Sequence, residues 1–273
     1  MTTSDAASTD RELESALAFW RDAGLEVCVE DSPIDRIHVP QPVRRTPMLA
    51  VGAPSQAEGP ATDIAAAVAD ARARAAEAQT LDALSAAIAA FEGCPLRRLG
   101  AKQAVFARGK PDARVMLIGE GPGAEEDQRG EPFVGQAGRL LDRMLGAIDL
   151  TDDVFITNTV FWRPPGNRTP TLEEQLTCAP FVERAIALVQ PELLVLVGGA
   201  AAKFMLKTDE GVLKLRGQWR DWRPAEGGRS YPALPMLHPA YLLRQPREKA
   251  KAWQDLLSLS ERLAATGGGS LES

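Results

Sequence analysis

GEGPGAEEDQRGEPFVGQAGRLLD, residues 119–142, directly follows the strand-like segment Ala113–Ile118 and says more about the fold than any other part of the chain. Glycine and proline weaken regular structure, and clustered carboxylates such as those of Glu125, Glu126 and Asp127 repel one another. Beside a buried strand, this composition is costly if it serves stability alone. It therefore indicates a functional loop that begins where the strand ends.

A pattern of strand, loop and helix recurs from this point onward. Short apolar segments predict strands at Ala113–Ile118, Val154–Thr159, Leu193–Val197 and Ala233–Leu237. Helical patterns follow at Gly135–Ile148, Leu172–Val189, Ala200–Leu206 and Lys249–Ala264. Such alternation is typical of a parallel sheet covered on both faces. We therefore expect an α/β fold with three layers, α/β/α, around a central, mainly parallel four-stranded sheet.

Two further loops of unusual composition follow predicted strands. Thr157–Pro170 reads TNTVFWRPPGNRTP, and His238–Pro246 reads HPAYLLRQP. In open α/β sheets, ligands bind outside the carboxyl ends of the strands. The three loops are therefore expected to converge on one crevice.

The first ninety residues predict a helical N-terminal extension with its own composition. We expect an acidic helical segment over residues 1–39, a Pro- and Ala-rich linker over 40–60 and a helical segment over 61–90. The main domain is expected over residues 91–265, with a flexible tail over 266–273.

The net charge of −6 at first argues against a nucleic-acid partner, because phosphate contacts require cations. Residues 1–90 contain seven Lys or Arg and fourteen Asp or Glu, a net charge of −7. Residues 91–273 contain 24 and 23, a net charge of +1. The acidity thus belongs to the extension, and the main domain permits local contact with DNA.

Composition also restricts the compartment. No apolar run approaches the roughly 20 residues that span a bilayer, and the N-terminus lacks the basic and apolar regions of a secretory signal. Three cysteines, an odd and sparse count, favour reduced thiols over a disulfide framework. We expect a cytoplasmic monomer with no membrane partner.

Four elements of this chain resemble the motifs of the family-four uracil-DNA glycosylases, which are GE(G/A)PG, PFVG, TNxxKCRPPxNRxP and HPxxLLR. All four occur here in order, and the similarity runs roughly from Phe91 to Leu263. Several motifs in the right order are more specific than any one alone. The resemblance implies a DNA repair glycosylase that hydrolyses the N-glycosidic bond of deoxyuridine in DNA, releasing uracil and leaving an abasic site.

Two other functions stay open, a non-catalytic module that binds uracil or damaged DNA and a nucleoside hydrolase. A dinucleotide-binding loop is disfavoured, because Gly119–Gly123 lacks the G-x-G-x-x-G spacing and contains Pro122. The carboxylates of Glu125, Glu126 and Asp127 would also stand where a pyrophosphate docks. We expect no nucleotide cofactor and a partner that is uracil-containing DNA.

The resemblance implies a uracil-binding set of Gly121, Glu126, Phe133 and Asn158. Phe133 would stack on the base, and the amide of Asn158 would read its Watson–Crick edge, because an amide offers both donor and acceptor. Related families have Asp or Asn where this chain has Gly121, so water is handled by another group. Taken alone, Phe133 could be a core residue and Asn158 a strand cap. For Glu126 we expect the role of an organiser or helix-start carboxylate near the pocket.

Three residues are expected to be catalytic. The resemblance implies that His238 donates a hydrogen bond to uracil O2 as negative charge develops there. Glu120 and Asn167 are the candidates for directing the water. A lone histidine is more often structural, but the HPAYLLR context favours the catalytic role.

The expected DNA-binding residues are Arg168, Leu242, Leu243 and Arg244. The two leucines and Arg244 resemble the wedge that enters the duplex and holds the space left by the flipped base. Either leucine could instead pack on the core at the start of an ordinary helix.

Family-four enzymes usually hold a [4Fe–4S] cluster, and the resemblance places the ligands at Phe91, Cys94, Trp162 and Cys178. Only Cys94 and Cys178 remain, whereas a cluster needs four good ligands. We therefore expect no cluster and no metal, with the two aromatic side chains filling the space by burying apolar surface. The alternative is a cluster completed by ligands that are remote in the sequence.

Overall fold

The predicted parallel strands form the centre of the sheet in a computed structural model, which describes residues 64–267 of the 273-residue chain. These strands are β2 (Val115–Gly119), β3 (Val154–Asn158), β4 (Leu193–Val197) and β6 (Tyr231–Met236). β2 pairs in parallel with β3 and β4, and β4 pairs in parallel with β6. The segments expected at residues 1–39 and 40–60, and all but the first residues of the tail, lie outside the described residues.

Two short edge strands complete a six-stranded sheet with the order β1-β3-β2-β4-β6-β5. β1 (Ala107–Gly109) runs antiparallel to β3, and β5 (Arg220–Trp222) runs antiparallel to β6. The expectation of four strands therefore missed both edges. Three residues are too few for an alternating pattern to be recognised in the sequence.

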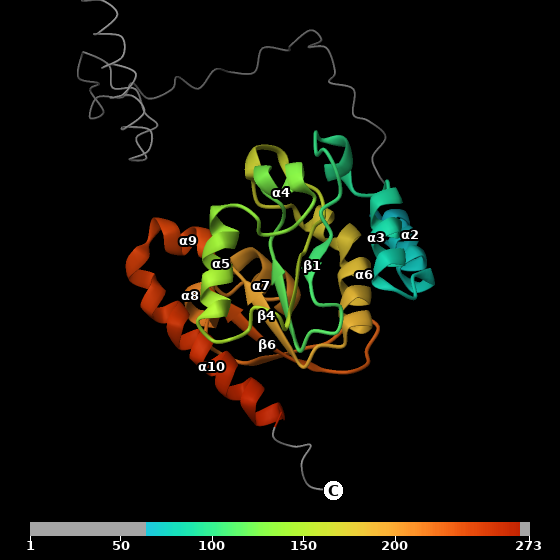
Figure 1. The fold of residues 1–273 in the computed structure, drawn as a ribbon. Coiled ribbons are helices and arrows are strands. Elements are labelled where there is room, and N and C mark those ends of the chain that lie inside the picture. The colour runs from blue at the N-terminus through green and yellow to red at the C-terminus, as the bar shows by residue number, and fades with distance from the viewer. Residues whose placement is uncertain (1–63, 268–273) are drawn as a thin grey trace, which may run out of the picture. The chain divides into compact units, whose positions relative to one another are not determined.

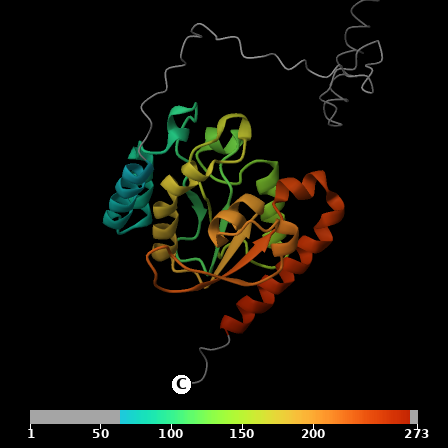
Figure 2. The same ribbon diagram turned by 180° about the vertical axis from the view of Figure 1, so that it is seen from behind.

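The central strands are buried on both faces, as the three-layer prediction requires. Met116 and Ile118 of β2 face the layer that contains α6 (Leu172–Val189) and α7 (Gly199–Leu206). Val115 and Leu117 face the opposite layer, which contains α5 (Gln136–Gly146) and α10 (Lys249–Gly267). Figure 1 and Figure 2 show these layers on either side of the sheet. The α/β/α architecture is thus confirmed.

The helical segment expected before the main domain consists of α2 (Ile64–Glu77) and α3 (Leu81–Ala90). Thr80 caps α3, because its hydroxyl accepts the Ala83 N–H at 3.1 Å. Side chains of both helices, including Ala71 and Leu84, share the hydrophobic cluster that contains α6. α2 and α3 therefore pack as part of the α/β core.

The remaining described elements are short and lie in the connections between strands and long helices. They are α4 (Ala124–Arg129), α8 (Val212–Leu215), α9 (Pro239–Arg244), η1 (Pro95–Arg98), η2 (Pro165–Asn167) and η3 (Pro246–Glu248). Among the helices of residues 64–267, none combines the length and the apolar character required to cross a membrane.

The four positions that correspond to cluster ligands lie together in the core beside α6. Phe91, Cys94 and Cys178 are fully buried, Trp162 is nearly so, and the two sulfur atoms are 3.8 Å apart. The Phe91 ring lies 6.4 Å from that of Trp162. Burial raises the pKa of the Cys178 thiol well above its usual range, whereas the hydrogen bond with Cys178 lowers the pKa of the Cys94 thiol. Two aromatic side chains and two sulfur atoms thus fill this space.

Phe91→Ala should lower the free energy of unfolding by about 3–5 kcal/mol, because it removes a fully buried ring and leaves a cavity. Urea denaturation followed by circular dichroism measures this loss. Leu172→Ala is the control, since that side chain is 64% exposed and its truncation should change stability by less than about 0.5 kcal/mol. Equal effects of the two substitutions would contradict the packing described above.

Candidate active site

A cavity of about 470 Å³ opens at the carboxyl ends of the parallel strands. All three unusual loops contribute to its lining, as the strand order predicts. Of the predicted site residues, it brings together Glu120, Gly121, Glu126, Phe133, Asn158, Asn167, Arg168, His238 and Arg244. Leu242 and Leu243 are the two predicted residues that do not line it.

The centre of the site is set by the pairing of β2 with β3, which places Gly119 opposite Asn158. A Cβ atom at position 119 would overlap Asn158 Oδ1 and lie 2.6 Å from the Phe133 ring. Glycine is therefore required where the amide and the ring approach the backbone. Sequence reasoning noticed this glycine as part of a loop but missed its steric role.

The side chain of Asn158 is buried without a complete set of partners. The residue is 1% exposed, and its Oδ1 atom has no hydrogen-bond partner in the described part of the chain. An unsatisfied buried acceptor is unfavourable, and native structures contain few of them. This oxygen therefore indicates a ligand that supplies a hydrogen-bond donor.

His238 ends the loop after β6 and caps α9. Its Nδ1 atom accepts the Ala240 N–H at 3.1 Å, so the neutral ring carries its proton on Nε2. Burial, together with the positive charge of Arg244, lowers the pKa of His238 to about 4. The imidazole is therefore a neutral donor at physiological pH. Its ring lies 5.7 Å from the Phe133 ring at an interplanar angle of 29°.

Glu126 joins the two parts of the first loop. Its carboxylate accepts the N–H groups of Gly123, Val134 and Gly135 at 3.1, 3.0 and 2.9 Å. These bonds hold the start of α4 against the segment that carries Phe133. Glu126 lines the cavity as expected, and its hydrogen bonds make it a brace between loops. The sequence predicts an organising carboxylate here, and the folded loops show which N–H groups it binds.

The two candidates for directing water differ in their surroundings. The carboxylate of Glu120 lines the cavity and makes no hydrogen bond with another side chain described here, whereas its backbone carbonyl accepts the Thr159 hydroxyl at 2.6 Å. Asn167 is exposed, and its Oδ1 accepts the Arg163 Nε–H at 2.7 Å. Glu120 therefore has the acceptor that a water molecule could use.

Gly121 lies beside Glu120 and packs closely on the segment that follows β3. A Cβ atom there would lie 2.8 Å from Val160 Cγ2. A larger residue would push the loop away from the end of β3. The position thus lines the cavity with backbone alone.

Of the predicted DNA contacts, Arg168 and Arg244 line the cavity, and the expectation for Leu242 needs a correction. Leu242 is 1% exposed and packs with Ala252 in a buried cluster, so its side chain cannot act as a wedge in this conformation. Leu243 is 41% exposed on the same helix. Arg168 is held by two hydrogen bonds to the carboxylate of Glu174, at 2.8 and 2.6 Å.

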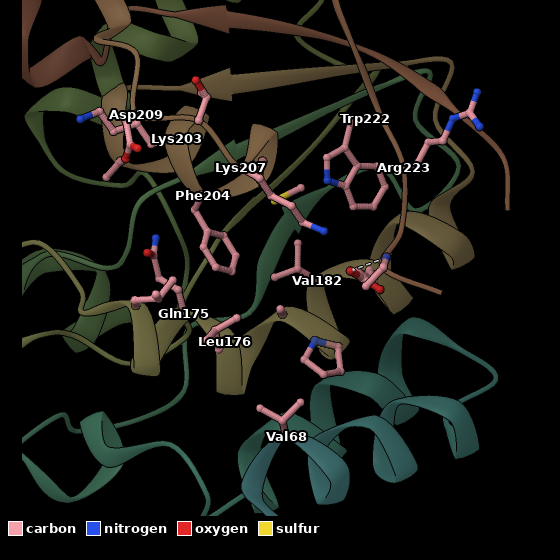
Figure 3. A pocket seen from close by; sticks show the side chains of 18 of the residues that line it. Val68, Gln175, Leu176, Val182, Lys203, Phe204, Lys207, Asp209, Trp222 and Arg223 are labelled. Atoms are coloured by element: carbon pink, nitrogen blue, oxygen red, sulfur yellow. Dashed lines mark hydrogen bonds between the residues drawn. The ribbon is translucent and has the colours of Figure 1, made fainter. Parts of the chain in front are cut away.

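A larger cavity, about 560 Å³, lies among α2, α6 and α7 and shares Thr169 with the smaller one. Figure 3 shows apolar side chains such as Leu176 and Phe204 around it, with Lys203 and Lys207 nearby. None of the predicted catalytic or uracil-binding residues lines this space. It also lacks a buried, unpartnered amide, so the smaller cavity is the better candidate for chemistry.

The residues present do not fit a [4Fe–4S] cluster. Within residues 64–267, no group of three or more His, Cys, Asp or Glu side chains is arranged to hold a metal ion. Cys94 and Cys178 supply two sulfur atoms, and Phe91 and Trp162 occupy the other two ligand positions. The third cysteine of the chain, Cys28, lies outside the described residues.

The lowered pKa of His238 predicts a specific loss of stability in acid. Unfolded histidine binds a proton below about pH 6.5, whereas folded His238 stays neutral until about pH 4. The unfolded state therefore binds more protons in this window, and the free energy of unfolding falls as the pH falls. Urea denaturation at a series of pH values should show a smaller fall in His238→Gln. Parallel curves for the two proteins would refute the assignment.

Comparison with known proteins shows the family of the chain. Residues 106–257 match the Uracil DNA glycosylase superfamily. A type-4 uracil-DNA glycosylase of Thermotoga maritima is 39% identical over 168 residues, covering 61% of this chain and 84% of that protein. One of Saccharolobus solfataricus is 35% identical over 191 residues, covering 68% and 87%. A type-5 enzyme of Thermus thermophilus is 34% identical over 139 residues, covering 45% and 60%. The chain belongs to the uracil-DNA glycosylase superfamily.

Proposed function

We propose that this protein is a monofunctional uracil-DNA glycosylase, which hydrolyses the N-glycosidic bond of deoxyuridine in DNA and leaves an abasic site. The observation that carries the proposal is the buried, unpartnered Oδ1 of Asn158 in a cavity that also contains the neutral donor His238. The relatives named as type-4 uracil-DNA glycosylases support the same reaction.

Recognition of uracil begins when the base leaves the duplex and enters the cavity. The N3–H group of uracil is a donor that matches the free acceptor of Asn158, and the O4 atom accepts from the amide nitrogen. Cytosine has an unprotonated N3 and an amino group at C4, which reverse both requirements. Phe133 contributes a ring face against which the base stacks.

Cleavage develops negative charge on the departing uracil, chiefly at its carbonyl oxygens. The Nε2–H of neutral His238 donates to O2 in this state, because Nδ1 is already occupied by the Ala240 N–H. Glu120 accepts a hydrogen bond from the attacking water, and its negative charge also favours the oxocarbenium-like sugar. Asn167 also lines the cavity, but its Oδ1 atom accepts a hydrogen bond from Arg163.

Contact with DNA is proposed at the end of α9. Leu243 is exposed and enters the space that the flipped base leaves, while Arg244 and Arg168 approach phosphates. A nucleoside hydrolase would not require an exposed leucine near the end of α9. A non-catalytic binding module would keep the pocket without needing the Nε2–H donor or a free carboxylate at Glu120.

The finer features of the proposal follow from the same residues. The protein works as a monomer in the cytoplasm, where its thiols stay reduced, and it uses neither a nucleotide cofactor nor an iron–sulfur cluster. Its partner is uracil-containing DNA.

His238→Ala should reduce the single-turnover rate of uracil release by about 10²–10³, because it removes one preorganised donor. The assay follows release from a uracil-containing oligonucleotide at saturating enzyme. Lys203→Ala, in the other cavity, is the control and should retain the wild-type rate. A near-normal rate in His238→Ala would refute the catalytic role.

Asn158→Asp should change which base is excised, because a protonated carboxyl can donate to N3 of cytosine. Cytosine release should become measurable, as judged by cleavage of the resulting abasic sites in oligonucleotides that contain a single target base. Asn158→Ala should release neither base and serves as the control for simple disruption. Unchanged rates and specificity in Asn158→Asp would rule out edge reading by this residue.

The protein should be active without iron. Preparations purified without oxygen should lack the broad absorbance near 400 nm of a [4Fe–4S] cluster, and chelators should leave uracil release intact. The double substitution Phe91→Cys with Trp162→Cys is the matched comparison, since it restores four thiols. Stoichiometric iron and sulfide in the wild-type protein would contradict the proposal.

A further inference from the structure

Phe133 holds a backbone conformation that a bulky residue rarely adopts. Its φ angle is 55°, in the left-handed region, although its side chain is buried and stacked on His238. Such a conformation persists only when the surrounding structure determines it. The groups that hold the Phe133 peptide therefore also hold the wall of the uracil cavity.

Two charged side chains, Glu126 and Arg108, form hydrogen bonds with the backbone of residues 132–135. Glu126 accepts the N–H groups of Val134 and Gly135 through one carboxylate oxygen. Arg108, on the edge strand β1, donates from Nε to the Pro132 carbonyl at 2.8 Å and from a terminal nitrogen to the Phe133 carbonyl at 3.3 Å. Both peptide groups that flank the Phe133 Cα are thus held, the first through the Pro132 carbonyl and the second through the Phe133 carbonyl and the Val134 N–H.

The guanidinium of Arg108 is itself oriented by α5. The nitrogen that contacts the Phe133 carbonyl also donates to Asp142 Oδ1 at 2.5 Å. α5 approaches the same carbonyl so closely that a Cβ atom on Gly138 would overlap it. The Arg108 side chain is only 26% exposed, so these contacts are partly shielded from water.

We propose that Arg108 is a positioning residue of the glycosylase, one that acts on the base through Phe133. The planar guanidinium of Arg108 holds the backbone of Phe133 in its left-handed conformation. That conformation places the Phe133 ring beside the His238 ring. The inference rests on the proposed function, because the ring that Arg108 positions is the one proposed to stack on uracil. Lysine cannot replace Arg108, because a single ammonium group cannot reach two successive carbonyls and a carboxylate at the same time.

The test compares Arg108→Met with Arg114→Met. Arg114 is the matched control, because it also pairs with a carboxylate, Glu192 at 2.7 Å, and donates to a backbone carbonyl, that of Leu263. It precedes β2, at the end of the strand remote from the site. Both substitutions should lower thermal stability. Only Arg108→Met should reduce the saturating single-turnover rate, by about 10- to 100-fold, through misplacement of the ring.

Two further measurements separate positioning from general disruption. Inhibition by free uracil should weaken in Arg108→Met and stay unchanged in Arg114→Met, while binding of uracil-free duplex stays unchanged in both. Added guanidinium at non-denaturing concentration should partly restore the rate of Arg108→Ala and should not affect Arg114→Ala. Arg108→Lys should remain slow.

Each outcome decides the inference. Equal rates in Arg108→Met and wild type, or equal losses in the Arg108 and Arg114 variants, would overturn it. Wild-type protein that releases no uracil would instead overturn the proposed function. In that case the affinity for free uracil, measured by calorimetry, tests the role of Arg108. The positioning role is wrong if Arg108→Met binds uracil as tightly as the wild-type protein does.

Discussion

The contact on which the site depends is the close approach of Gly119, Asn158 and the Phe133 ring at the end of β2. The parallel register of β2 and β3 makes residues 119 and 158 neighbours, and the absence of a side chain at 119 lets the amide and the ring occupy the same corner. The other residues with a proposed role in the cavity lie around this corner. His238 faces the ring, and Glu120 follows Gly119 directly.

The site departs from the rules that the rest of the fold obeys. The central strands bury apolar side chains on both faces, whereas Asn158 leaves a buried acceptor without a partner and Phe133 has a left-handed backbone. Both features are unfavourable in the unliganded protein. Such departures are typical of functional sites, because the surrounding structure maintains a geometry that a ligand completes. Here the braces are Glu126, which binds N–H groups of the loop, and Arg108, which binds its carbonyls.

Much of this arrangement could be predicted from sequence, because the central strands and long helices have strong patterns. β4 and α6 have the expected bounds, and the predicted loops converge on one cavity. The edge strands were missed because three residues show no periodicity. The burial of Leu242 depends on packing against Ala252 of α10, which no local pattern reports. The hydrogen bonds of Arg108 join residues that are distant in the chain, so its importance becomes visible only in the folded structure.

The central claim is that Asn158 Oδ1 accepts the N3–H group of uracil, and product inhibition tests it most directly. Free uracil and 3-methyluracil differ at N3, where the methyl derivative has no donor. Inhibition constants for both compounds are measured in the uracil-release assay with wild-type protein. We expect inhibition by uracil and loss of that inhibition with 3-methyluracil. Equal inhibition by the two compounds would contradict it.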